Sequence, residues 1–294
     1  MANLVIGQTG FIGSAIFSSL EDSIPFKPSS WELNDFEQEI EKIRDSNNLN
    51  VFWAAGKSNN NSSRLEVEKE IELINLFLKL LQVYKITISK FNYISSAGSI
   101  YSGCSDEYIN SDTKESPLSD YGKSRLEIEN SLKIYCSSNN IKLNIFRLTN
   151  VFGFKHRLKL NSGVINNLID ANINQIPVNI FVSLFVKQDY IDIDFVKNNI
   201  YNIALNNSKY ANNSSNTFIF SRNYSHSIQE IISTINRITN KKTPYVMQYD
   251  PNAELRNSIL NFKVDNRNFI KFKINSLEFQ IRKLISEMIY AKIS

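Results

Sequence analysis

The stretch Asn3-Leu-Val-Ile-Gly7-Gln-Thr-Gly10-Phe-Ile-Gly13 decides the fold. Residues 3–6 form a short β-like run, three glycines follow, and Ile12, Ile16 and Leu20 then recur at helical spacing. In such a strand–turn–helix unit the first glycine permits the tight turn, the second lets the backbone approach a pyrophosphate, and the third lets helix and strand pack closely. The N-terminus of the helix favours an anion. The predicted dinucleotide-binding residues of this turn are Gly7, Thr9, Gly10, Phe11, Ile12 and Gly13.

Strand-like and helix-like segments alternate after this turn. The predicted strands are 24–27, 50–55, 91–95 and 143–148, and the predicted helices are 11–20, 35–43, 65–84 and 121–135. This alternation predicts βαβ units and a parallel sheet, and the continuously apolar strands indicate that both faces are covered. The fold class is therefore α/β, a Rossmann-type doubly wound parallel sheet.

The regularity falls after residue 153, which predicts a smaller C-terminal substrate lobe. Its expected elements are an extended segment at 182–191 and helices at 162–172, 227–239 and 277–293, with Ser227 and Glu230 as a capping box. We expect residues 1–153 and 186–207 to form the dinucleotide-binding domain. Residues 154–185 and 208–294 would form the lobe, with some of this chain returning to the first domain.

Composition narrows the classes of function. The 294 residues are 42% hydrophobic and 21% charged, which is typical of a globular chain, and the net charge of +4 has no basic cluster that would indicate nucleic-acid binding. No apolar run approaches the ~18 residues of a membrane span, and the N-terminus does not resemble a signal peptide, so we expect a cytoplasmic protein. Cys104 and Cys136 are expected to be thiols. His156 and His226 lack ligand-type neighbours, so no metal is expected.

The end of the predicted second strand bears on the choice of cofactor. The carboxylate that usually binds the adenosine ribose follows the glycine turn by about 20 residues, yet no Asp or Glu ends this strand. Lys27 and Ser29 could instead face a 2′-phosphate, which favours NADP(H) over NAD(H) unless Lys27 is only a solvated surface lysine.

A second group of residues suggests proton transfer. The predicted strand 91–95 runs into Ser95-Ser96-Ala97-Gly98-Ser99-Ile100-Tyr101, and Tyr121-Gly-Lys-Ser-Arg125 opens the next predicted helix. Tyr121 and Arg125 share a helix face, and a nearby cation stabilises a phenolate, so that Tyr121 could act as acid or base near neutral pH. A neighbouring serine could hydrogen-bond the substrate oxygen. The acidic run from Glu66 to Glu72 is expected to be a solvated helix face.

Taken in order, several motifs are similar to those of the extended short-chain dehydrogenase/reductase family, in its nucleotide-sugar epimerase, dehydratase and ketoreductase branch. They are the glycine turn, Trp53-Ala-Ala-Gly56, Ser95-Ser96…Tyr101, Tyr121-Gly-x-Ser-x, Arg147-Leu-Thr-Asn150-Val-Phe-Gly153, Gln188-Asp-Tyr-Ile-Asp-Ile-Asp194 and Ser227-Ile-Gln-Glu230. The resemblance implies NAD(P) bound by the Rossmann domain, with Ala54, Ala55, Gly56, Tyr121 and Arg125 at the cofactor. It also implies a nucleoside-diphosphate sugar in the lobe, Asn150 at its phosphate, and a homodimer formed through helices 65–84 and 121–135.

The chain departs from the family pattern at three positions. Arg125 replaces a lysine that is usual there; it keeps the positive charge, but its planar fork is not interchangeable with an ammonium. Ala97 stands where a hydroxyl residue is usual, so we assign the substrate-oxygen contact to Ser96, with Ser95 and Ser99 as alternatives. Gln188 replaces an arginine that holds the diphosphate in relatives, and Arg222 or Arg256 could supply that charge instead.

The expected function is hydride transfer on a nucleotide-linked hexose. Tyr121 would be the acid/base, Arg125 its charge partner and ribose ligand, and Ser96 the donor to the substrate oxygen. A 4-ketoreductase or a 4-epimerase in surface polysaccharide biosynthesis fits the chain best. A catalytically impaired member that binds dinucleotide as a sensor or scaffold is the alternative, and a reductase of a small non-nucleotide carbonyl is a third.

Overall fold

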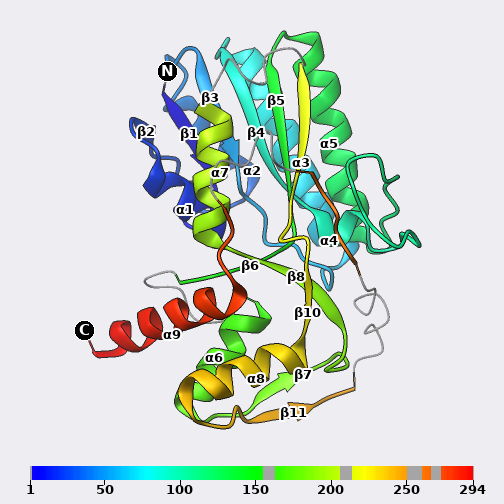
Figure 1. Cartoon of the computed structure of the whole chain (residues 1–294). Coiled ribbons are helices and arrows are strands. Elements are labelled where there is room, and N and C mark those ends of the chain that lie inside the picture. Colours follow the sequence, from blue (N-terminus) through cyan, green and yellow to red (C-terminus); the bar gives the residue numbers. More distant parts are fainter. Residues whose placement is uncertain (1, 155–162, 206–213, 250–259, 266–272, 294) are drawn as a thin grey trace.

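The computed structural model describes residues 2–154, 163–205, 214–249, 260–265 and 273–293. It has a larger part built on a six-stranded sheet and a smaller lobe beneath it (Figure 1). The sheet order is β2-β1-β3-β4-β5-β9, and every neighbouring pair is parallel. The strands are β1 (Asn3–Ile6), β2 (Ser23–Ile24), β3 (Leu49–Trp53), β4 (Ile88–Ser96), β5 (Lys142–Leu148) and β9 (Ser215–Phe220). The predicted α/β Rossmann-type fold is confirmed.

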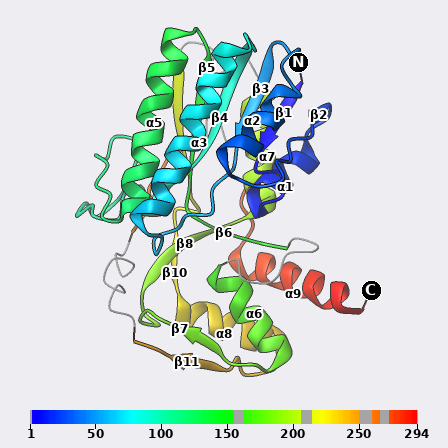
Figure 2. The same ribbon diagram turned by 180° about the vertical axis from the view of Figure 1, so that it is seen from behind.

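Helices cover both faces of this sheet (Figures 1 and 2). Successive strand residues point to opposite faces, so Leu4 and Ile6 of β1 enter one apolar core while Val5 between them enters the other. The helices α2 (Leu33–Glu41), α3 (Arg64–Val83) and α5 (Asp120–Ser138) pack on the first face. The helices α1 (Phe11–Ser19) and α7 (Ile193–Leu205) pack on the second. This double coverage explains why the strands read as apolar runs.

The strand order reverses between β1 and β3. From β1 the chain passes to β2 on one side and then crosses to β3 on the other. In open α/β sheets, ligands bind outside the carboxyl ends of the strands at such a switch point. The glycine turn after β1 and the segment after β3 are therefore the part of the fold where a ligand is expected.

The lobe has an apolar core of its own. This core is built from α6 (Val164–Asn174), β7 (Val178–Ile180), α8 (Ile228–Thr239) and α9 (Leu277–Ile293). The exposed strand β11 (Tyr245–Met247) pairs with β7. A three-stranded sheet of β6 (Asn150–Phe152), β8 (Lys187–Asp192) and β10 (Ser225–Ser227) lies between the lobe and the larger part (Figure 1). The predicted capping box is confirmed: Ser227 and Glu230 each accept a hydrogen bond from the other's backbone N–H. None of the helices within the described ranges is long and apolar enough to cross a membrane.

The expected division of the chain needs correction in its second half. β9 pairs with β5 and completes the six-stranded sheet, although residues 208–294 were assigned to the lobe. Leu260, Phe262 and Val264 also pack in the larger part, beside the short helix α4 (Ala97–Ile100). β8 pairs with β6 and β10, and α7, which follows it, packs on the six-stranded sheet. Because β9 forms by pairing with distant strands, no local periodicity marked it. β2 is shorter than predicted, since Pro25 cannot donate a ladder hydrogen bond.

Candidate active site

The turn between β1 and α1 is packed tightly enough to require its glycines. Gly7 has a φ of +94°, and a Cβ there would lie 2.6 Å from the backbone of Ala54 and Ala55. A Cβ on Gly13 would lie 2.1 Å from the Gly7 carbonyl oxygen, so α1 can approach β1 only because position 13 has no side chain. Gly10 is the N-cap of α1, and no described side chain caps this helix. The turn therefore presents backbone and a helix N-terminus, as an anionic pyrophosphate needs.

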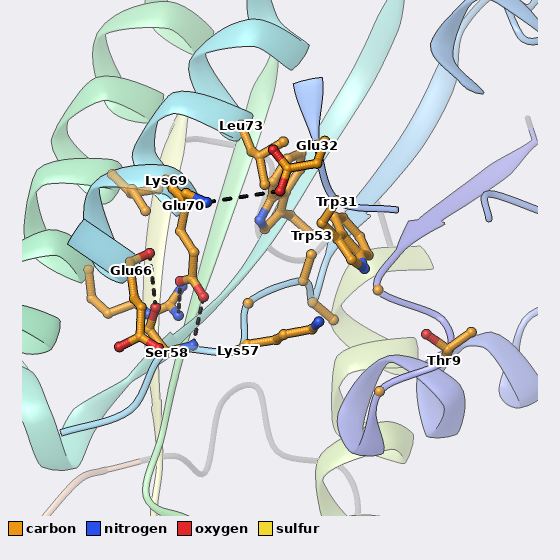
Figure 3. A pocket seen from close by; sticks show the side chains of 17 residues that line it. Thr9, Trp31, Glu32, Trp53, Lys57, Ser58, Glu66, Lys69, Glu70 and Leu73 are labelled. Carbon is orange, nitrogen blue, oxygen red and sulfur yellow. Dashed lines mark hydrogen bonds and ion pairs between the residues drawn. The ribbon is translucent and has the colours of Figure 1, made fainter. Parts of the chain in front are cut away.

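A cavity of about 500 Å³ opens beside this turn (Figure 3). It lies at the carboxyl ends of β1 and β3, at the switch point of the sheet. Both tryptophans of the chain, Trp31 and Trp53, line it. The other lining residues are Gly7, Thr9, Gly10, Glu32, Ala54, Ala55, Gly56, Lys57, Ser58, Glu66, Lys69, Glu70, Leu73, Arg125 and Ile128. Of the predicted cofactor-binding residues, six from the two turns and Arg125 are thus brought together.

Arg125 is buried at the inner wall of the cavity. Its Nη2 donates to the Glu70 carboxylate at 2.7 Å, and its Nη1 donates to the Tyr93 hydroxyl at 3.0 Å. The guanidinium also lies over the Tyr121 ring, 4.6 Å from the centroid. Its Nε has no hydrogen-bond partner among the described residues. A buried donor that lacks a partner is costly, and a further acceptor at this nitrogen would lower that cost.

The charge state of this cluster follows from its contacts. Burial alone would lower the pKa of Arg125, but the nearby Tyr121, Tyr93 and Glu70 together hold it well above its usual value. Burial raises the pKa of Tyr93, although Arg125 opposes that rise. Arg125 is therefore a permanent cation next to Tyr121, while Tyr93 stays a neutral phenol that anchors the guanidinium.

The serines at the end of β4 have different surroundings. Ser95 is buried and donates to Glu129 at 2.7 Å, so its hydroxyl proton is used within the core. Ser96 is partly exposed at the start of α4, where its hydroxyl donates to the Ser99 hydroxyl at 3.1 Å. A Cβ on Gly122 would lie 2.5 Å from the Ser99 carbonyl oxygen, so the first turn of α5 packs directly on α4. Ser96 and Tyr121 are thus carried by two elements that are in contact with each other.

Asn60, in the loop between β3 and α3, was not expected at the site. Its side-chain oxygen accepts hydrogen bonds from Ser99 at 2.9 Å and from Ser119 at 3.0 Å. It therefore ties this loop to the start of both α4 and α5. A single asparagine in a loop of an asparagine-rich chain carries no sequence signal, so only the folded arrangement reveals it.

The acidic face of α3 differs from its expected role as a solvated surface. Glu66 and Glu70 line the cavity, and the Glu70 side chain is only 13% exposed. Their spacing of four residues places both on one face of the helix. Glu68 lies on another face and pairs with Arg64 at the surface. The spacing was therefore the available signal, but the partner of Glu70 lies 55 residues away in the chain.

The expected 2′-phosphate contact is not part of the described cavity lining. Lys27 is exposed, and its backbone N–H donates to Glu39. Glu32 lines the cavity instead, and Lys69 of α3 lies 3.9 Å from its carboxylate. The polypeptide after β2 thus contributes a carboxylate rather than a lysine.

The predicted substrate residues lie apart from this cavity. Asn150 is exposed on β6, where its amide donates to the Asp189 carbonyl. Arg222 is held by the Tyr190 carbonyl at 3.0 Å, the Asn275 carbonyl at 2.6 Å and the Gln280 side chain. These bonds tie the end of β9 to β8 and α9, so all three nitrogens of its guanidinium are used within the fold. Arg256 lies outside the described residues, as does His156.

Asp189, within the motif shared with relatives, is a buried structural carboxylate. It accepts hydrogen bonds from Thr149, Ser221 and the Arg222 backbone N–H. Burial raises its pKa, although these donors oppose the rise. The described residues contain no cluster of three or more His, Cys, Asp or Glu that could hold a metal ion.

The fold and this site define a Rossmann-type α/β protein with a cavity at the switch point of its sheet, beside a tyrosine–arginine pair. A model of the NAD dependent epimerase/dehydratase family matches residues 35–213, which is more than half of the chain. The chain belongs to this family of extended short-chain dehydrogenases/reductases, as the ordered motifs predicted.

Curated relatives include a reductase and an epimerase. The chain is 26% identical over 217 residues to dTDP-4-dehydro-6-deoxyglucose reductase of Escherichia coli, covering 65% of this chain and 68% of the relative. It is 28% identical over 225 residues to a putative UDP-glucose 4-epimerase of Methanocaldococcus jannaschii, covering 69% and 73%.

Solved structures share the whole fold. UDP-glucose 4-epimerase of Thermotoga maritima with UDP-glucose superposes with a TM-score of 0.82 at 18% identity, over 100% of both chains. The complex of Thermus thermophilus UDP-glucose 4-epimerase with NAD gives 0.78 at 18% identity, over 98% of this chain and 99% of that one.

Proposed function

We propose that this protein is an NAD(H)-dependent enzyme that transfers a hydride at a sugar carbon of a nucleoside-diphosphate sugar, as a 4-ketoreductase or a 4-epimerase. The observation that carries the proposal is the cavity at the switch point, where the glycine turn and the buried Arg125 with its unpartnered Nε meet. Both features fit a dinucleotide: the glycine turn offers backbone N–H groups to the pyrophosphate, and Arg125 offers a hydrogen-bond donor. The reductase and epimerase relatives support the substrate class, and a role in surface polysaccharide biosynthesis would follow from it.

Within this proposal the side chains have distinct tasks. A bound nicotinamide would supply the acceptor and donor of hydride. Tyr121 moves the proton at the substrate hydroxyl, and the guanidinium of Arg125 lies over its ring and holds it in place. Arg125 also offers Nε to a cofactor ribose oxygen. Ser96 donates to the substrate oxygen, with Ser99 beside it.

The cavity lining favours NAD(H) over NADP(H). A carboxylate near the end of the second strand suits two ribose hydroxyls and repels a 2′-phosphate. Glu32 lines the cavity there, whereas Lys27 is not among the described lining residues. We therefore expect NAD⁺ to bind more tightly than NADP⁺.

The first test is a binding titration that uses the two tryptophans. Because Trp31 and Trp53 are the only tryptophans and both line the cavity, NADH should quench their fluorescence through energy transfer. Thermal unfolding with NAD(H), NADP(H), nucleoside diphosphates and their sugars gives the second readout, since a ligand at 100 times its Kd stabilises by about 2.7 kcal/mol. Absence of any dinucleotide response would refute the proposed function.

A member that binds without turnover is the second candidate. The Arg125 guanidinium is engaged by Glu70 and Tyr93 within the protein, and its planar fork is not interchangeable with an ammonium. Dinucleotide binding together with no hydride transfer to any sugar nucleotide of the panel would favour this sensor or scaffold function. We also propose a cytoplasmic homodimer formed through α3 and α5, for which light scattering of the purified chain is the test.

A further inference from the structure

We propose that Glu70 is the positioning residue of this site: it fixes the Arg125 guanidinium and the loop after β3 in one arrangement, so that the nicotinamide half of a dinucleotide meets a preformed donor. This inference rests on the proposed function, because it assumes a dinucleotide in the cavity. It concerns a residue outside the motifs that led to the family.

Glu70 divides its carboxylate between two parts of the wall. Oε2 accepts from Arg125 Nη2 at 2.7 Å, and Oε1 accepts from the Ser58 backbone N–H at 2.7 Å (Figure 3). Arg125 comes from α5, Ser58 from the loop after β3, and Glu70 from α3. One side chain thus connects three elements that meet at the cavity.

The loop lies directly on this ion pair. A Cβ on Gly56 would lie 2.8 Å from Arg125 Nη2 and 3.0 Å from Glu70 Oε2, and Gly56 has a φ of +145°. The backbone therefore reaches the pair only because Gly56 has no side chain. The ion pair supports the loop segment that lines the cavity, in addition to neutralising a buried charge.

The position of Glu70 explains how an arginine can stand at this place in the helix. Glu70 engages Nη2 and Tyr93 engages Nη1, which leaves Nε–H as the donor without a described partner. Both ends of the planar fork are then fixed, so its remaining donor has a defined direction. Without Glu70, the cation would be buried with the neutral Tyr93 phenol as its hydrogen-bond partner, and only one end of its planar fork would be fixed.

The test compares ligands that share the adenosine half and differ in the other. Glu70→Gln keeps the size of the side chain, but it removes the charge and one of the two acceptors. We expect it to weaken NAD⁺ and ADP-ribose by about tenfold or more, because a charge-assisted hydrogen bond is lost. Its affinity for ADP should stay within about twofold of wild type, since ADP lacks the second ribose. A general defect of folding would weaken all three ligands alike.

Glu68→Gln is the matched control. It makes the same change on the same helix, and it breaks a surface ion pair with Arg64 at the same 2.7 Å distance. All three affinities should remain at the wild-type value. A double-mutant cycle adds a second criterion: Glu70→Gln combined with Arg125→Gln should bind NAD⁺ about as weakly as Arg125→Gln alone, because the two residues act as one unit.

Glu70→Asp covers the case in which Glu70→Gln does not fold. It keeps the charge, but its carboxylate is one methylene shorter and cannot reach both Arg125 and Ser58. We expect an intermediate loss of NAD⁺ affinity with ADP unaffected. Equal binding of NAD⁺ by wild type and Glu70→Gln, or an equal loss for ADP, would overturn the proposal while leaving the proposed function intact. Failure of wild type to bind NAD⁺ would instead overturn the function.

Discussion

At the scale of single residues, the site depends on side chains whose positions are fixed by the groups packed around them. Tyr121 lies under the Arg125 guanidinium, and the neighbouring Gly122 packs against the Ser99 carbonyl. The ring of Tyr121 is thus held against a fixed cation, on a helix whose first turn packs on the segment that follows β4. Proton transfer by a positioned side chain typically contributes 10²–10⁴-fold, roughly, to a rate.

Replacement of Tyr121 by phenylalanine separates chemistry from binding. Tyr121→Phe removes the proton donor and keeps the ring under Arg125. We expect hydride transfer to a sugar nucleotide to fall by about 10²–10⁴-fold while the Kd for NAD⁺ changes less than about threefold. Tyr135→Phe, at a partly buried tyrosine farther along α5, should be silent. Unchanged turnover in Tyr121→Phe would remove Tyr121 from the mechanism.

Gly13 and Gly98 give a matched pair for the glycine turn. A Cβ on Gly13 would overlap the Gly7 carbonyl, whereas a Cβ on Gly98 would have nothing within 4 Å. We expect Gly13→Ala to cost about 1–3 kcal/mol of unfolding free energy through overpacking, and to abolish the NADH signal. Gly98→Ala should fold and bind as wild type. Urea unfolding and the tryptophan titration check both expectations.

At the scale of elements, the sheet contains a buried row of asparagines. Asn50 donates to Asn3, Asn92 donates to Asn50, and Asn144 donates to Asn92, at 2.7–2.9 Å. The four residues lie on β1, β3, β4 and β5, close to the edge where these strands begin. Buried amides are stable only when they are paired, so the row favours one register of neighbouring strands.

Removal of one member should affect its neighbours as well. Asn92→Ala leaves the Asn50 oxygen and the Asn144 amide without this partner in the sheet interior. Since an unsatisfied buried group costs about 1–3 kcal/mol, we expect a loss of at least about 2 kcal/mol in unfolding free energy. Asn75→Ala, at an exposed asparagine of α3, should change stability by less than about 0.5 kcal/mol. Similar effects of both variants would show that the row contributes nothing specific.

At the scale of the whole molecule, Arg222 joins the sheet to the lobe. Its guanidinium binds β8 and the start of α9, while its backbone N–H binds Asp189. Burial lowers the pKa of Arg222, although Asp189 and Asp192 oppose that change. From the sequence, Arg222 is one of two arginines, with Arg256, that could supply the charge at the substrate diphosphate. The contacts instead describe a residue that connects the two parts of the molecule.

Arg222→Ala should therefore act on stability more than on the cofactor. We expect a loss of about 2–4 kcal/mol in unfolding free energy, because several partly buried hydrogen bonds are broken. The Kd for NAD⁺ should stay within about twofold of wild type. Arg237→Ala, which breaks an exposed ion pair with Glu278 in the lobe, should leave the stability close to that of wild type. A stable Arg222→Ala variant that loses affinity for nucleoside diphosphates alone would restore Arg222 to the substrate site.

The predictability of this protein depends on how far apart the interacting residues are in the chain. Helical and strand periodicities are local, so 3–6, 65–84 and 277–293 were predicted to within a few residues. The edge strand β9 is short and mixes polar with apolar residues, and it forms by pairing with β5. Its own sequence therefore did not predict it. Among site residues, the turn glycines carry a local signature. No local signature marks Trp31, Glu32 and Glu70, because their place in the cavity lining depends on which distant elements pack beside them.

The sequence by itself determined the α/β class, the glycine turn and the Tyr121–Arg125 pair, because each rests on contacts within about 10 residues or on one repeating period. The tertiary structure alone decided what surrounds them. In the folded chain, Glu70 binds both Arg125 and Ser58. Glu32 lines the cavity where Lys27 was expected, and Arg222 connects the sheet to the lobe. These outcomes depend on how strands and helices distant in the chain are brought side by side, and such packing leaves no periodic trace in the order of the amino acids.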